Sequence, residues 1–212
     1  MPEQRGHRGV VSHGTTRALL AGWAAASIPF SNIAAHATRG VDLREHGGGT
    51  VSGTGLFEVA GFGPLAVAGV FEVAKGAVGP ALARRDGARA VALAAAAAVC
   101  GHNWSPWLRG AGGRGLSPAI GALLVAAPAG AGVLLGGMAV GRIAGETAVG
   151  VLVADALLVP VVARVHGRDA ALAAVGVVAP MIVKRLVGNR SLPPTGRARV
   201  VWNRLLLDRD AA

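Results

Sequence analysis

The sequence has few charged and few aromatic residues, and it has a single cysteine. Only 15% of the 212 residues are Asp, Glu, Lys or Arg, tyrosine is absent, and tryptophan occurs 4 times. The lone Cys100 excludes an intrachain disulfide and a zinc site built from cysteines. We therefore predict no metal and no cofactor.

Apolar residues take the place of the missing charge. They make up 52% of the sequence, and the mean hydropathy is +0.51. Much of this content is alanine, which is nearly neutral towards lipid, so the ends of membrane spans are softly defined. The composition favours a membrane-embedded chain over a soluble domain.

Mostly apolar segments alternate with short polar segments along most of the chain. A crossing takes about 20 apolar residues, and neither alternating strands nor barrel turns occur, so we predict an all-α bundle of about seven transmembrane helices. The predicted helices cover residues 18–37, 59–83, 88–101, 116–128, 129–141, 146–163 and 169–187. If the two short central segments formed one helix kinked at Pro128, the number would be six.

This pattern divides the chain into three parts. Residues 1–17 form a polar N-terminal segment, 18–187 a single transmembrane domain, and 188–212 a basic tail. Within the tail, residues 203–209 are interpreted as an amphipathic basic helix lying on anionic lipid. The alternative is that they supply side chains to a functional site.

Two glycine-rich loops interrupt the apolar pattern: the first glycine loop (residues 46–50) and the second glycine loop (residues 109–115). Ser117-Pro118, directly after the second loop, is typical of a helix N-cap and first helical residue. Exposed backbone N–H groups beside a helix start can hold an anion, and Arg109 and Arg114 would add fork-shaped donors suited to phosphate. The alternative is a flexible turn at the membrane interface.

Two other kinds of glycine-rich site are excluded. No Lys-Ser or Lys-Thr follows the second loop, so it is not a nucleotide P-loop. The His-Gly-Gly-Gly of the first loop resembles an esterase oxyanion loop, but the chain contains no Gly-x-Ser-x-Gly nucleophile motif.

Ionisable residues inside the predicted spans are candidates for function, because burying them in hydrocarbon is costly. Glu72 and Lys75 are three residues apart, so they share a helix face and can form an ion pair. The alternative is that this pair only locks helix packing. Asp155 has no partner nearby in the sequence and should face the interior of the bundle.

The net charge of +10 would suggest nucleic acid as a partner of a soluble protein. Here the arginines stand at the ends of apolar runs, so we predict membrane lipids and no nucleic acid as partners. With seven spans and the N-terminus outside, both glycine loops and the tail would lie on the cytoplasmic face of a multi-pass plasma-membrane protein. The modest bias of Lys and Arg agrees with this orientation.

Four stretches together resemble the PlsY family, the integral-membrane acyl-phosphate glycerol-3-phosphate acyltransferases. Ser27 to Phe30 looks like the family's Gly-Ser-Ile-Pro-Phe, and residues 41–54 are similar to its first motif. Residues 72–76 resemble its acidic-x-x-Lys-Gly. Residues 101–115 are similar to its Gly-His…Pro…Gly-Gly-Lys-Gly, the most specific match.

The resemblance implies transfer of an acyl chain from acyl phosphate to glycerol 3-phosphate, giving lysophosphatidic acid. Acyl phosphate is already activated, so the protein mainly positions two anionic substrates. We predict catalytic roles for His102 and Arg114; the base is a side chain such as His102 or a substrate phosphate, and the alternative for His102 is a helix cap. The predicted substrate-binding residues are Arg44, Gly47, Gly48, Gly49, Thr50, Thr54, Lys75, Arg109, Gly112, Gly113 and Gly115.

Several positions depart from the family pattern. Serine, asparagine and arginine of the first motif are replaced by Gly48, Gly55 and Glu58. If the third motif is aligned on residues 184–186, its histidine and asparagine are replaced by Ala179 and Ile182. These departures motivate a second hypothesis, a paralogue that binds phosphate-bearing lipid or substrate without turnover. A transporter is a third, although no matching pair of broken helices occurs.

Overall fold

The computed structural model describes residues 12–209, and within this range every regular element is a helix. The α-helices are α1 (His13–Ser27), α2 (Phe30–Arg39), α3 (Gly53–Ala60), α4 (Phe62–Ala83), α5 (Ala88–Asn103), α6 (Leu116–Ala126), α7 (Pro128–Ile143), α8 (Thr147–His166), α9 (Arg168–Val187) and α10 (Arg197–Leu207). Two short 3-10 turns, η1 (Arg84–Asp86) and η2 (Pro106–Leu108), follow α4 and α5. The prediction of an all-α fold is confirmed.

Four helical stretches are long and apolar enough to cross a membrane. They are His13–Arg39, Phe62–Asp86, Thr147–His166 and Arg168–Val187. The apolar helices α6 and α7 are shorter, and α5 has 16 residues. Each of the seven predicted apolar segments is therefore mostly helical, with the long crossings at both ends of the series.

The two short central helices are separate. Ala127 is extended and Pro128 begins α7, where the missing N–H of proline costs nothing. Gly130 of α7 lies against Leu123 of α6, so the chain reverses direction between them. The prediction of two separate helices is confirmed, and the alternative of one helix kinked at Pro128 is wrong.

Three local predictions were wrong. The first span is two helices, because Ile28 is extended and Pro29 precedes α2. The helix predicted to start with Ser117 as its cap begins at Leu116, since Gly115, with φ of +84°, turns the chain into it. The polar connection between the first two predicted helices, residues 38–58, contains most of α3, whose N-cap Ser52 accepts a hydrogen bond from the Gly55 N–H.

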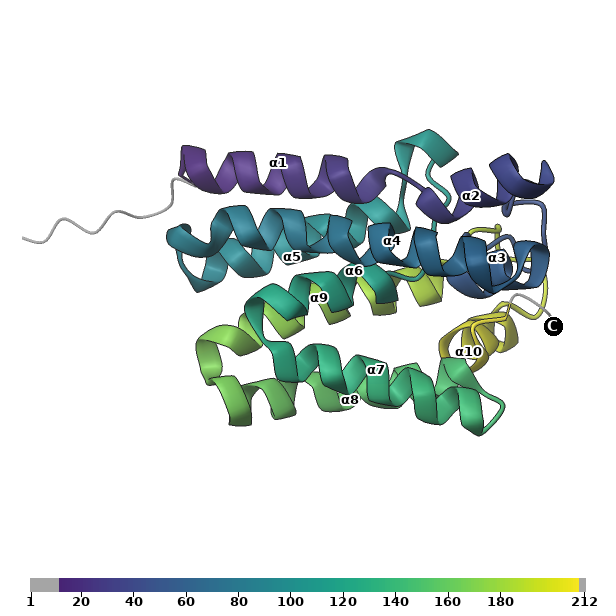
Figure 1. Ribbon diagram of the computed structural model, residues 1–212. Helices are drawn as coiled ribbons and strands as arrows, with labels where there is room; N and C mark the ends of the chain where they lie inside the picture. Colours follow the sequence, from purple (N-terminus) through teal and green to yellow (C-terminus); the bar gives the residue numbers. More distant parts are fainter. Residues whose placement is uncertain (1–11, 210–212) are drawn as a thin grey trace, which may run out of the picture.

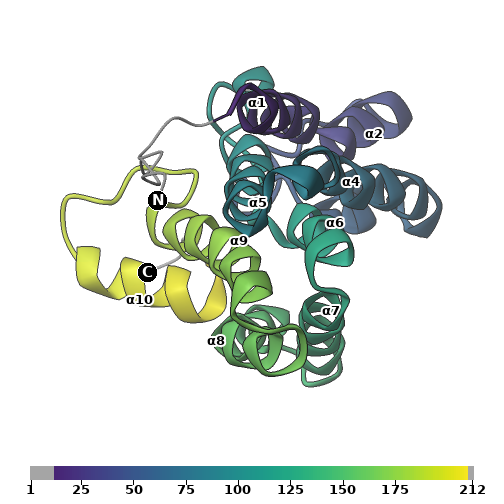
Figure 2. The same ribbon diagram turned by 90° about the vertical axis from the view of Figure 1, so that its left-hand side faces the viewer.

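The helices pack in successive layers (Figures 1 and 2). Helix α1 lies over α4 and α5, helices α6 and α9 lie beneath these, and the α7–α8 pair forms the far side. The largest buried cluster joins α5, α6, α7, α8 and α9 through side chains such as Leu123, Leu134 and Leu158. Asp155 of α8 is 2% exposed, so it faces the interior as predicted.

Glycines allow the closest helix contacts. A Cβ at Gly76 of α4 would overlap the Pro118 backbone of α6, and a Cβ at Gly121 would overlap the Val73 carbonyl. Small residues that bring backbones together are typical of helix packing in membranes.

The polar segments gather at the two ends of the bundle. Helices α2, α3 and α10 lie together at the end opposite the start of α1 (Figure 1). We call this the loop end, because both glycine loops are found there. A second apolar cluster, including Leu43, Val51 and Leu108, is buried beneath the loops and anchors them to α2, α3 and α4.

Candidate active site at the loop end

The two glycine loops lie against each other, although about 60 residues of sequence separate them. The Val51 N–H, directly after the first loop, donates to the Gly112 carbonyl of the second at 3.3 Å. Within the second loop, the Gly113 N–H donates to the His102 carbonyl at 3.3 Å. The prediction that both loops share one end of the bundle is confirmed.

Asn189, just beyond α9, bridges the two loops. Its Nδ2 donates to the Gly49 carbonyl at 3.1 Å and to the Gly112 carbonyl at 2.8 Å. Its Oδ1 accepts a hydrogen bond from the Gly112 N–H at 3.2 Å. The neighbouring Arg190 donates to the Gly47 carbonyl at 3.2 Å. Three separate segments of the chain thus meet at the glycine loops.

Glu72 is the centre of a buried polar cluster behind the loops. Its Oε1 accepts hydrogen bonds from the Ser31 backbone N–H at 2.9 Å and the Ser31 hydroxyl at 3.1 Å. Its Oε2 lies 2.7 Å from Lys75 Nζ and 3.2 Å from His102 Nδ1. Lys75 also donates to the Ile28 carbonyl at 2.5 Å. The predicted Glu72–Lys75 pair is confirmed, and it caps both helix ends at the α1–α2 break.

His102 joins this cluster to the second glycine loop. One ring nitrogen faces Glu72, and the other, Nε2, faces Gly113 closely enough that a Cβ at position 113 would overlap it. The side chain is 10% exposed. A histidine held in this way by a carboxylate has a fixed orientation and can exchange a proton on its other side.

The predicted arginines lie in three different settings. Arg114 is mostly buried and forms an ion pair with Asp208 of the tail. Arg44 lies 2.5 Å from Asp42, and this hydrogen-bonded pairing lowers the pKa of the Asp42 carboxyl group. Arg109 is exposed and has a left-handed φ of +56°. Arg114 is the one of these three that packs among the elements of the site.

The first glycine loop forms the outer rim. Gly47 and Gly48 are exposed, whereas Gly49 is buried beneath the Arg190 side chain. Thr54 is exposed near the start of α3. Glu58 of the same helix is also exposed, and its carboxylate lies 3.4 Å from His46. This rim is therefore open to solvent.

Basic side chains gather where α9 ends, and partial negative charge is expected there from the helix dipole. Lys184 is buried and lies over the Trp104 ring at 5.2 Å. Arg185 donates to the Ala148 carbonyl at 3.0 Å. Arg204, on α10, is 1% exposed and donates to the Val187 carbonyl at 2.5 Å. The tail helix is Arg197–Leu207, so it begins before the predicted segment 203–209, and a buried guanidinium packs it onto α9.

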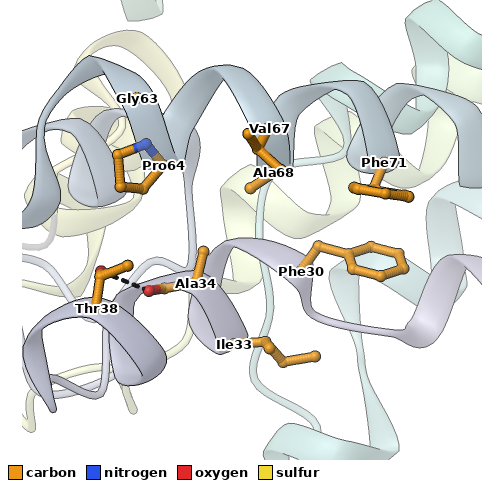
Figure 3. A pocket seen from close by; sticks show the side chains of 9 residues that line it. All are labelled: Phe30, Ile33, Ala34, Thr38, Gly63, Pro64, Val67, Ala68 and Phe71. Carbon is orange, nitrogen blue, oxygen red and sulfur yellow. Dashed lines mark hydrogen bonds between the residues drawn. The ribbon is translucent and has the colours of Figure 1, made fainter.

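An apolar groove of about 430 Å³ lies between α2 and α4, next to the Glu72 cluster (Figure 3). The rings of Phe30 and Phe71 stack at 5.2 Å, and Lys75 Nζ lies 5.7 Å from the Phe30 ring. The groove thus begins beside the charged cluster. It is lined by Phe30, Ile33, Ala34, Thr38, Gly63, Pro64, Val67, Ala68 and Phe71.

Several residues of the site could not be found from the sequence. Asn189 follows a glycine that ends a helix, and nothing in the sequence indicates that its amide reaches both loops. The contact between Glu72 and His102 joins α4 to α5 and has no local pattern either. Ala179, aligned with the family's third-motif histidine, lies on the exposed side of α9 and is not part of the site.

No group of three or more His, Cys, Asp or Glu side chains that could hold a metal ion occurs within residues 12–209. The chemistry available at the loop end is instead that of backbone N–H groups, a carboxylate-held histidine, arginines and an apolar groove. Fold and site together define an all-helical integral membrane protein with a partly buried polar site at one end of its bundle.

The family model described as glycerol-3-phosphate acyltransferase matches residues 16–190, and the chain belongs to this family. Glycerol-3-phosphate acyltransferase 5 of Dehalococcoides mccartyi is 30% identical over 205 residues, which cover 90% of this chain and 87% of that protein. The glycerol-3-phosphate acyltransferase of Myxococcus xanthus is 37% identical over 150 residues, covering 64% and 78% of the two chains.

A solved structure supports the fold. The crystal structure of PlsY, an integral membrane glycerol 3-phosphate acyltransferase, in its glycerol 3-phosphate form superposes with a TM-score of 0.74 and 21% identity. The match covers 93% of this chain and 94% of that one. The chain is thus a membrane acyltransferase of phospholipid biosynthesis. These comparisons give no support to the alternative of a paralogue without turnover.

Proposed function

We propose that the protein transfers an acyl chain from acyl phosphate to the sn-1 hydroxyl of glycerol 3-phosphate at the loop end. The products are lysophosphatidic acid and inorganic phosphate. One observation carries this proposal: the two glycine loops are hydrogen-bonded to each other beside His102, and an apolar groove starts at the same cluster. A phosphate site and an acyl site are thereby neighbours.

The reaction needs positioning more than covalent chemistry. The acyl carbon–oxygen bond to phosphate breaks, a bond from the carbon to the hydroxyl oxygen of the acceptor forms, and the hydroxyl proton leaves. Backbone N–H groups of the glycine loops, with Arg114 nearby, offset the charge of the phosphoryl groups. His102, oriented by Glu72, accepts the proton, or a phosphate oxygen of the substrate does so while His102 donates to it.

The groove between α2 and α4 suits the acyl chain. Thr38 is the one polar side chain among the residues that line it. Ile33, Val67 and Phe71 are each more than half exposed, as is expected of side chains that face lipid. Phe30 and Phe71 stack at one end of the groove (Figure 3). Lys75 lies over the Phe30 ring, so this end is the one nearest the Glu72 cluster. A chain that enters from the bilayer would carry its phosphate towards the loops.

Acyl phosphate and glycerol 3-phosphate are anions of the cell interior, so the proposal puts the loop end on the cytoplasmic face of the plasma membrane. The predicted substrate-binding glycines and His102 would then face the compartment that holds both substrates. Membrane lipid supplies the surroundings of the groove.

The test is transfer by the purified protein in proteoliposomes, with palmitoyl phosphate as donor and glycerol 3-phosphate as acceptor. We expect lysophosphatidic acid and inorganic phosphate in equal amounts. His102→Ala should lower kcat about 100-fold or more, because general acid–base catalysis typically contributes that much. His166→Ala, at the opposite end, is the matched control and should keep wild-type rates.

Two results would overturn parts of the proposal. Saturable phosphate binding without product would favour the binding paralogue over the enzyme. Wild-type kcat in His102→Ala, with transfer intact, would remove the histidine from the reaction and leave proton transfer to the substrate phosphate.

A further inference from the structure

We infer that Asn189 is the positioning residue that fixes the two glycine loops relative to each other, and that the tail helix α10 holds Asn189 in place through Arg204. This inference rests on the proposed function, since it names what keeps the phosphate pocket assembled. It assigns the tail a part in the site without any contact between the tail and substrate.

The Asn189 amide is chemically matched to what it binds. Its two N–H groups reach carbonyls of different loops, Gly49 and Gly112, while its oxygen accepts the N–H of Gly112. Only a side chain with two donors and one acceptor on a single planar group can make all three bonds. Aspartate offers no donor, and alanine offers neither donor nor acceptor.

The glycine loops need contacts from another segment to hold one conformation. Glycine has no side chain to pack and loses more conformational freedom on ordering than any other residue. One direct hydrogen bond, from the Val51 N–H to the Gly112 carbonyl at 3.3 Å, joins the segments. Asn189 adds a link to each loop, and one of its bonds is the shorter 2.8 Å contact to Gly112.

Arg204 determines where Asn189 stands. Its guanidinium donates to the Val187 carbonyl at 2.5 Å and to the Arg190 carbonyl at 2.6 Å, on either side of Asn189. Gly188 between them has φ of +69°, and a Cβ there would lie 2.7 Å from the Arg204 Cζ. Arg204 is 1% exposed, so it attaches α10 to the turn of residues 187–190 through a buried contact.

The experiment compares wild type with Asn189→Asp, which keeps the shape and removes both donors, and Asn189→Ala. Ser191→Ala, an exposed position in the same turn, is the matched control. Hydrogen–deuterium exchange is followed in peptides that cover 47–51 and 110–115, and KM and kcat are measured for both substrates. Peptides from α8 report any global unfolding.

We expect both Asn189 variants to exchange about tenfold faster in both loop segments, with α8 unchanged, since the loss of about 1.4 kcal/mol of hydrogen bonding corresponds to that factor. KM for the phosphate-bearing substrates should rise about tenfold while kcat falls less. If Asn189→Asp does not fold in detergent, Asn189→Ala, which adds no charge, decides the question.

Unchanged loop exchange and unchanged KM in a folded Asn189 variant would overturn the inference. The exchange measurement needs no turnover, so faster loop exchange in a protein that makes no lysophosphatidic acid would leave the inference standing and overturn only the proposed function.

Discussion

At the scale of single residues, Glu72 shows how one buried carboxylate can serve several neighbours. It caps α2 through Ser31, pairs with Lys75 and orients His102. Spacing three apart on a helix was enough to predict the Glu72–Lys75 pair. The contacts to Ser31 and His102 could not be predicted, because they depend on how α2 and α5 pack against α4.

Glu72→Gln should destabilise the protein by about 3 kcal/mol. Glutamine can still accept from Ser31, but it leaves the Lys75 ammonium buried at 3–4% exposure without a counter-charge. Stability is measured by denaturant-induced unfolding in detergent. Adding Lys75→Met to the same chain should recover part of the loss, because the stranded charge is then gone.

The matched control is Glu146→Gln, which removes one partner of the exposed Glu146–Arg209 pair and should cost less than 1 kcal/mol. Equal losses for Glu72→Gln and Glu146→Gln would contradict the account of the buried cluster.

At the scale of helices, prolines show why a sequence predicts spans better than their breaks. Pro80, Pro160 and Pro180 lie inside helices that continue through them, whereas the chain breaks at Pro29. At the break, the Ile28 carbonyl and the Ser31 N–H have side-chain partners: Lys75 donates to the carbonyl, and Glu72 accepts from the N–H. These partners come from α4, so no local pattern distinguishes Pro29. Helix α3 was not predicted because it has only 8 residues and contains Gly55, and glycine disfavours a helix.

Gly76→Ala should destabilise the bundle by about 1–3 kcal/mol. The added methyl group would overlap the Pro118 backbone, which cannot rotate away as a side chain would, so α4 and α6 must separate. Gly69→Ala is the matched control on the same helix, because no atom lies within 4 Å of its Cβ position. It should be neutral or stabilising by less than 1 kcal/mol. Unfolding in detergent, measured for both variants, checks the difference.

At the scale of the whole molecule, the bundle has two chemically different ends. The loop end holds the glycine loops, His102 and the basic residues where α9 stops. The opposite end carries η1, where the exposed Arg84 donates to the Val125 carbonyl. The number of predicted helices indicates that both loops share an end, because helix count alone fixes which connections lie together. The contact between the loops could not be predicted, since it depends on Asn189 and on the buried Val51.

Orientation in the membrane follows from the proposed reaction, because both substrates are made and kept inside the cell. The measurement is cysteine labelling in a Cys100→Ala background. One cysteine is added, either Arg85→Cys at the opposite end or Ser191→Cys at the loop end, and both positions are exposed. A membrane-impermeant maleimide should label Arg85→Cys in intact spheroplasts and Ser191→Cys only after permeabilisation. The reverse pattern would place the loop end outside, where neither substrate is available, and would contradict the cytoplasmic assignment. Labelling of both in intact spheroplasts would instead put the two ends on one face, which the seven predicted crossings do not permit.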